Sequence, residues 1–217
     1  MVKKSKESLV NNLKDMKVYK DIAFLDLFKR AFFTIKPSKK RILFFICVFF
    51  IMLYPSYFII VSGETLQTIN LVLDKANTII LSLFAVGFTG YALFQALINR
   101  NTLKILFVSK GKKYSLFEEY NLYFFSMTIA YLCIIIFNFI MIIFTIAIKP
   151  EWFSIEMKRV LNPICIAFIS LYLSVIVSAV VEIKSFILNL FQCFNISATS
   201  QMIEELKNLD DDLQEKK

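Results

Sequence analysis

Four long apolar runs without a charged side chain constrain this chain more than any other feature. They cover residues 42–61, 76–98, 122–148 and 161–181. A helix needs about 20 mostly apolar residues to cross the roughly 30 Å of hydrocarbon in a bilayer. All four runs reach that length, so the sequence predicts four transmembrane helices.

Lysine and arginine are divided unevenly among the segments that flank these runs. Segments 1–41, 99–121 and 182–217 hold 21 of these bases, whereas segments 62–75 and 149–160 hold 4. The cytoplasmic flanks of membrane proteins carry the excess of Lys and Arg. The division therefore predicts that both termini and the loop between the second and third runs are cytoplasmic.

These features predict an all-α integral membrane protein built as a four-span helical bundle. We expect a basic cytoplasmic N-terminal segment (1–41), a transmembrane domain (42–181), and a cytoplasmic helical extension and tail (182–217). The composition is rich in Lys, Ile, Phe and Asn and lacks His, as AT-rich coding produces. It favours a multi-pass protein of a bacterial inner membrane.

The inventory of reactive side chains argues against an enzyme. The absence of His removes Ser-His, Cys-His and His-metal designs, and the four runs contain no Asp or Glu for acid-pair chemistry. The four cysteines have no metal-site spacing. We therefore predict no catalytic residue, no metal and no cofactor. No nucleic-acid-binding signature accompanies the net charge of +8, so we assign the basic surplus to anionic lipid headgroups of the bilayer.

Residues 22–35 fit an amphipathic helix next to the first run. One face is aromatic and the other is charged, and the residues expected at the membrane surface are Phe24, Phe28, Lys29, Arg30 and Phe32. A helix of this kind suits the headgroup region of a bilayer. The open alternative is a helix that packs against the cytoplasmic parts of a neighbouring subunit.

The fourth run carries a polar stripe, because Ser170, Ser174, Ser178 and Glu182 recur every four residues. Small polar residues allow helix backbones to approach closely, which favours a packing seam. The alternative is the wall of an oligomeric pore with Glu182 as an acidic ring at its cytoplasmic end. In the third run, Asn138 is an amide deep in hydrocarbon and requires a hydrogen-bond partner. A packing contact is favoured there over a ligand contact.

The tail contains a second helical pattern. Met202, Leu206, Leu209 and Leu213 have spacings of 4, 3 and 4, which is an a/d seam for contact with an oligomer or a partner. So short a helix is marginal alone, and the polar residues 195–200 predict a break before it. The alternative is a solvated acidic tail.

A small bundle without catalytic groups acts through oligomers or partners. We therefore expect a homo-oligomeric, membrane-embedded adaptor or sensor subunit that recruits a soluble cytoplasmic protein, with a phage-defence or toxin-immunity module as the hypothesised setting. The alternatives are an oligomeric ion pore or pore-forming effector lined by the fourth run, and a small subunit of a transporter. No motif identifies a substrate, a reaction or a ligand.

Overall fold

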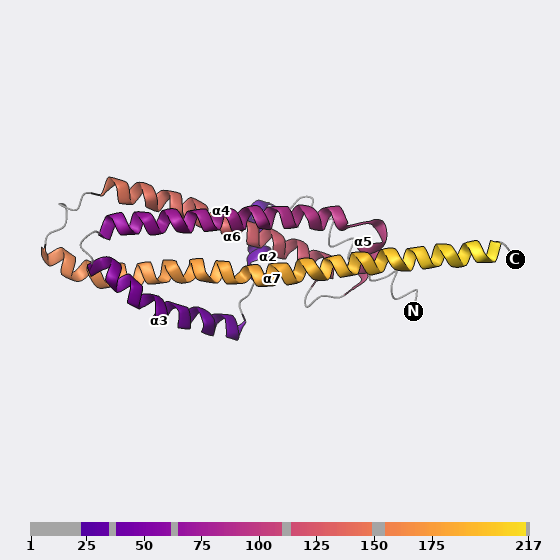
Figure 1. Ribbon diagram of the computed structural model, residues 1–217, viewed down its shortest axis with the longest axis horizontal. Helices are drawn as coiled ribbons and strands as arrows, with labels where there is room; N and C mark the ends of the chain where they lie inside the picture. The colour runs from indigo at the N-terminus through magenta and orange to yellow at the C-terminus, as the bar shows by residue number, and fades with distance from the viewer. Residues whose placement is uncertain (1–22, 35–37, 62–64, 110–113, 149–154, 216–217) are drawn as a thin grey trace. The chain divides into compact units, whose positions relative to one another are not determined.

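The computed structural model describes residues 23–34, 38–61, 65–109, 114–148 and 155–215. Within these ranges the chain forms six helices and no strand, which confirms the predicted all-α class. In chain order they are α2 (Phe24–Thr34), α3 (Lys39–Val61), α4 (Thr65–Leu97), α5 (Arg100–Val108), α6 (Leu116–Ala147) and α7 (Ile155–Glu215) (Figure 1).

Four helices are long and apolar enough to cross a membrane: α3, α4, α6 and the part of α7 between Asn162 and Leu206. Their number agrees with the four predicted spans. Helix α4, however, begins at Thr65, well before the second apolar run starts at Ala76. The stretch 65–75 lies in the segment between the first two apolar runs and contains Gln, Asn, Asp and Lys. It contains no Gly or Pro that would stop a helix, so α4 continues through it.

Helix α7 continues through residues 195–200, where the sequence predicted a break. Tertiary contacts account for this difference. The Ser197 hydroxyl donates a hydrogen bond to the Leu97 carbonyl at the end of α4, at 3.0 Å, and both Ser197 and Ser200 are buried. Hydroxyls that would otherwise compete for the helix backbone are thus held on a packed face.

The chain divides into two compact units. One comprises residues 37–86 and 129–184, and we call it the α3 unit because it contains all of α3. The other comprises residues 1–36, 87–128 and 185–217, and we call it the α5 unit because it contains all of α5. Helices α4, α6 and α7 are each divided between the two units, with one part of the helix in the α3 unit and the other part in the α5 unit.

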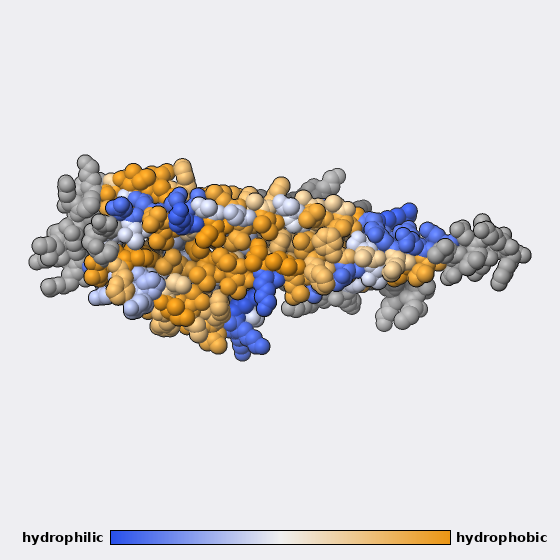
Figure 2. Space-filling view, in the orientation of Figure 1, coloured by the Kyte–Doolittle hydropathy of each residue, from blue (hydrophilic) through white to orange (hydrophobic). Residues whose placement is uncertain are grey.

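Polar side chains join the helices of the α3 unit, while large apolar side chains cover the outer faces of α3 and α6. Phe50 and Ile51 of α3 and Phe139 of α6 are exposed, and apolar colour dominates the surface around them in Figure 2. Hydrophilic colour gathers at the start of α3, where Lys39, Lys40 and Arg41 precede the apolar run. An apolar exterior with polar groups turned inward is the arrangement that hydrocarbon requires.

Aromatic rings in mutual contact form the core of the α5 unit. The ring centroids of Phe94 and Phe124 lie 5.2 Å apart, those of Phe107 and Phe117 lie 4.9 Å apart, and Phe124 meets Phe186 at 5.4 Å. These rings come from α4, α5, α6 and α7. Helix α5 is fixed at its start by Asn99, whose side chain accepts a hydrogen bond from the Thr102 amide at 2.7 Å.

Candidate functional sites

The serine stripe of α7 faces the interior of the α3 unit. Ser170 and Ser174 are 0% exposed. The Ser170 hydroxyl donates to the Ile166 carbonyl at 2.7 Å and also lies 3.3 Å from the Met52 carbonyl of α3. The Ser174 hydroxyl donates to the Ser170 carbonyl at 2.7 Å. In a single chain these serines support close contact between α7 and α3.

This contact falls where proline weakens the backbone of α3. Pro55 has no N–H, so the carbonyl one turn before it loses its usual donor. The next carbonyl, that of Met52, accepts a hydrogen bond from Ser56 at 2.7 Å in addition to the contact with Ser170. Hydroxyl groups from the same helix and from α7 therefore add donors to the turn of α3 that contains Pro55.

The other two members of the stripe lie nearer the start of α3. The Ser178 hydroxyl oxygen is buried, and among the described residues it has no hydrogen-bond partner. Glu182 forms an ion pair with Arg41 of α3 at 3.1 Å. An acidic ring built from Glu182 would have to compete with this ion pair within each chain.

Asn138 joins α6 to α7 inside the α3 unit. Its side chain is fully buried, and its Oδ1 accepts a hydrogen bond from the Tyr172 hydroxyl at 3.0 Å. Its Nδ2 has no hydrogen-bond partner among the residues described. Sequence reasoning found the amide but not its donor, because one tyrosine among several in apolar runs gives no signal of its own.

The predicted tail seam is only partly described. Met202 and Leu206 are 68% and 60% exposed. The side chains of Leu209 and Leu213 lie outside the described residues. Further upstream on α7, Ile187, Phe191 and Phe194 are also exposed at spacings of 4 and 3, although the step of eight residues from Phe194 to Met202 interrupts the a/d repeat. Together the exposed apolar residues are Ile187, Phe191, Phe194, Met202 and Leu206. We call these five residues the α7 stripe.

The buried face of α7 in the α5 unit is a different one. Phe186, Cys193, Ser197 and Ser200 are all buried there. Phe186 and Phe191 are both aromatic and lie only five residues apart, yet the structure buries the first and exposes the second. The regular spacing of the small residues Cys193, Ser197 and Ser200 is the signal that distinguishes the packed face.

The candidate membrane-surface helix is present as α2. Phe28 and Arg30 are half-buried and Lys29 is exposed. The side chains of Phe24 and Phe32 lie outside the described residues. A position of α2 at the membrane surface therefore stays a prediction.

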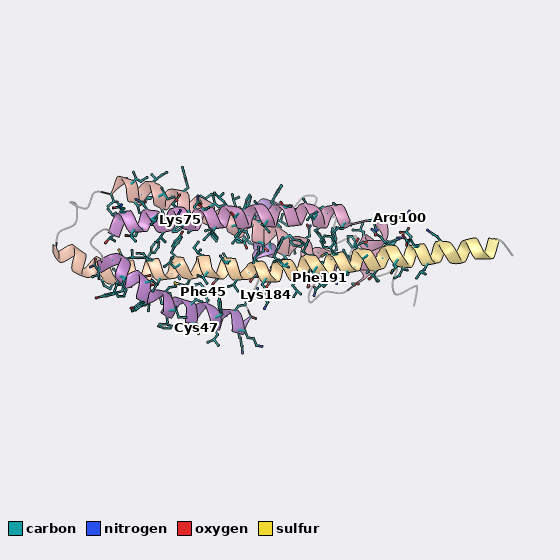
Figure 3. All side chains as sticks on the ribbon, viewed as in Figure 1. Phe45, Cys47, Lys75, Arg100, Lys184 and Phe191 are labelled. Atoms are coloured by element: carbon teal, nitrogen blue, oxygen red, sulfur yellow. The ribbon has the colours of Figure 1, made fainter. Side chains whose placement is uncertain are left out.

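A polar region on α4 was missed because it lies outside the four predicted spans, in the segment 62–75. The Thr145 hydroxyl of α6 lies within hydrogen-bond contact of the Asn70 amide oxygen. Next to it an open hollow is lined by Gln67, Thr68, Asn70, Leu71 and Asp74. Lys75 follows Asp74 on α4 (Figure 3), and both side chains are exposed.

These observations define a class only: an all-helical protein with four helices that can span a membrane. The chain matches no protein-family model, no curated protein and no solved structure. Within the described ranges no group of three or more Cys, Asp or Glu side chains is placed to hold a metal ion.

Proposed function

We propose that this protein is a homo-oligomeric, membrane-embedded adaptor or sensor subunit that recruits a soluble cytoplasmic protein through the α7 stripe. Its proposed location is a bacterial inner membrane with both termini in the cytoplasm. A phage-defence or toxin-immunity module is the setting we propose for it.

The observation that carries this proposal is the exposure of the α7 stripe. The stripe extends from Ile187 to Leu206, which corresponds to about 29 Å of helix at roughly 1.5 Å per residue. The fourth apolar run ends at residue 181, inside the longer apolar helix 162–206, and together with the positive-inside pattern this favours a position of the stripe beyond the last span, on the cytoplasmic side. Large apolar side chains that repeat on one helix face in water favour burial in the groove of a partner protein.

Charge on the flanks of the stripe defines the kind of partner. Glu204 and Glu205 are exposed beside Met202 and Leu206, and the sequence continues with three aspartates at 210–212. The partner should therefore present an apolar groove with Lys and Arg at its rim. Such rim charges contribute mainly to the association rate and to specificity.

Site-specific photo-crosslinking in intact membranes tests the proposal. A photoreactive residue at Met202 or Leu206 should crosslink to a soluble cytoplasmic protein. Replacing Phe191 and Phe194 by Ser, with the crosslinker at Leu206, should abolish the adduct. The matched control replaces the exposed polar residues Gln201 and Asn208 by Ser and should leave it intact. Adducts only to lipid or only to other copies of this chain would refute the adaptor function.

An oligomeric pore lined by α7 remains the alternative, but the geometry gives it less support. Ser170 and Ser174 are enclosed by their own chain, and Glu182 already pairs with Arg41. A packing seam needs small residues, whereas a pore also needs polar ones. We therefore expect the triple variant Ser170→Ala, Ser174→Ala, Ser178→Ala to assemble and function normally. Loss of a parental conductance with intact assembly would favour the pore. No observation favours a transporter subunit.

A further inference from the structure

The interhelical contacts of the α3 unit set the level of each residue along the bundle. Arg41 meets Glu182 at one end, and Met52 meets Ser170 further along the same two helices. The first apolar run extends from Ile42 to Val61, and Met52 stands at its middle. The level of Met52 and Ser170 is therefore the middle of the α3 span.

Contacts of α6 bring α4 into the same register. Asn138 is level with Tyr172 of α7, and Thr145, two turns away on α6, is level with Asn70 of α4. Asp74 follows Asn70 by one helical turn along α4, and this turn brings it closer to the level of Asn138. It therefore lies between these two contacts, as Ser170 does on α7. Asp74 and Lys75 are thus level with the middle of α3.

The length of α3 fixes where this level falls in a bilayer. Its uncharged run, 42–61, directly follows Lys39, Lys40 and Arg41 and is only just long enough for a span, so crossing the hydrocarbon uses the whole run. Helix α4 begins at Thr65, shortly after Val61, and its first half belongs to the same compact unit as α3. The first half of α4 therefore shares the hydrocarbon layer with α3, including Asp74 and Lys75. Ionisable residues at that depth are rare, and they pair with one another or mark a functional site.

The exposed face of this part of α4 differs from a lipid-facing surface. It carries Gln67, Leu71, Asp74, Thr78 and Ser82, which follow one another at spacings of 4, 3, 4 and 4, with Ile79 and Leu81 exposed beside them. Hydrophilic colour marks the first half of α4 in Figure 2. The outward faces of α3 and α6 carry Phe and Ile instead. Among the described residues, neither Asp74 nor Lys75 has an ion-pair partner.

We propose that two copies of this chain pair through this face of α4, with the Asp74 carboxylate of each copy bound to the Lys75 ammonium of the other. A two-fold axis along the membrane normal sets equivalent residues of the two α4 helices at the same level. Asp74 of each copy then lies next to Lys75 of the other copy, so two identical ion pairs form. Thr78 and Ser82 lie one turn apart and are small enough for the two backbones to approach closely. The hollow lined by Asp74 in one copy accommodates the aliphatic stem of Lys75 from the other copy.

This inference deepens the homo-oligomer of the proposed function and does not depend on partner recruitment. Variants of the α7 stripe should lose the soluble partner and retain the α4 pair. Charge variants of α4 should lose the pair first. The two ideas can therefore fail separately.

Charge exchange between full-length chains in lipid bicelles is the decisive test. Asp74→Lys leaves two lysines on the face, and Lys75→Asp leaves two aspartates, so each variant should self-associate more weakly by roughly tenfold or more. Mixing the two variants restores both opposite-charge pairs. Energy transfer between labelled chains should therefore be stronger in the mixture than in either variant alone. Lys184→Asp changes an exposed charge on α7 and should leave self-association unchanged.

Unchanged self-association of both single variants, or a mixture no stronger than its components, would overturn the proposal. Cysteine crosslinking tests the geometry independently, in a chain whose four native cysteines are replaced by Ala. Thr78→Cys should form a disulfide between copies, whereas Phe139→Cys on the outward face of α6 should not. Leu71→Cys should resist a membrane-impermeant thiol reagent in the absence of detergent. Rapid labelling there would place this part of α4 in water and overturn the proposal.

Discussion

The hydrogen bond between Asn138 and Tyr172 is the residue-scale contact whose loss should be most informative. Asn138 is fully buried, and Tyr172 supplies a donor to its Oδ1 at 3.0 Å. Tyr172→Phe removes that donor and leaves a buried amide oxygen unsatisfied. We expect a loss of about 1–2 kcal/mol in the free energy of unfolding, measured by steric trapping in bicelles.

The double variant Asn138→Leu with Tyr172→Phe provides the control for this contact. It replaces both polar partners by apolar groups, so it should recover most of the stability that Tyr172→Phe loses. The size of this recovery in a double-mutant cycle measures the interaction free energy between Asn138 and Tyr172. Independent, additive effects of the two substitutions would contradict the contact.

Packing between α4 and α7 in the α5 unit is set at the element scale by Gly90. A Cβ at this position would overlap the ring of Phe186. That ring is buried and packed edge-on against Phe124, so it has little room to move. Gly90→Ala should therefore destabilise the protein by about 1–3 kcal/mol through overpacking. Thermal unfolding in detergent, followed by circular dichroism, measures the effect.

A smaller side chain on α7 should relieve this clash. Phe186→Leu combined with Gly90→Ala should be more stable than Gly90→Ala alone. Ala92→Val adds carbon atoms at an exposed position of the same helix and should change stability little. Equal losses for Gly90→Ala and Ala92→Val would show that added bulk on α4, and not the contact with Phe186, determines the result, because Ala at position 90 is itself the better helix former.

The number of membrane-spanning helices followed from hydropathy, whereas the residues at which the helices begin and end did not. Long apolar runs predicted four spans because few other segments can satisfy a backbone in hydrocarbon. Residues 65–75 of α4 lie outside the predicted spans, and the polar residues 195–200 of α7 predicted a break. Both stretches are helical, and Asn70 and Ser197 there bond to neighbouring helices. Such tertiary partners are not encoded in local hydropathy.

Residue roles showed the same division between local and tertiary information. The periodicity of Ser170 and Ser174 predicted a shared face, and both serines are buried. Neither the Arg41 partner of Glu182 nor the Tyr172 partner of Asn138 could be chosen from sequence, because each partner lies on a different helix, far away along the chain. Asp74 and Lys75 were missed for a different reason: the rule that spans are uncharged excluded them from the second run.

At the scale of the whole molecule, the distribution of basic residues predicts the orientation in the membrane. The predicted inner segments hold 21 Lys and Arg and the outer ones hold 4. Reporters that are active only in the cytoplasm should work at residue 1 and after residues 110 and 217, and fail after residues 68 and 154. Substituting Gln for Lys39, Lys40 and Arg41 still leaves a large excess of bases inside, so the orientation should persist. Cytoplasmic activity after residue 68 would contradict the four-span topology, because α3 would then not cross the bilayer. The level of Asp74 and Lys75 was derived from α3, so their placement in hydrocarbon would also be lost.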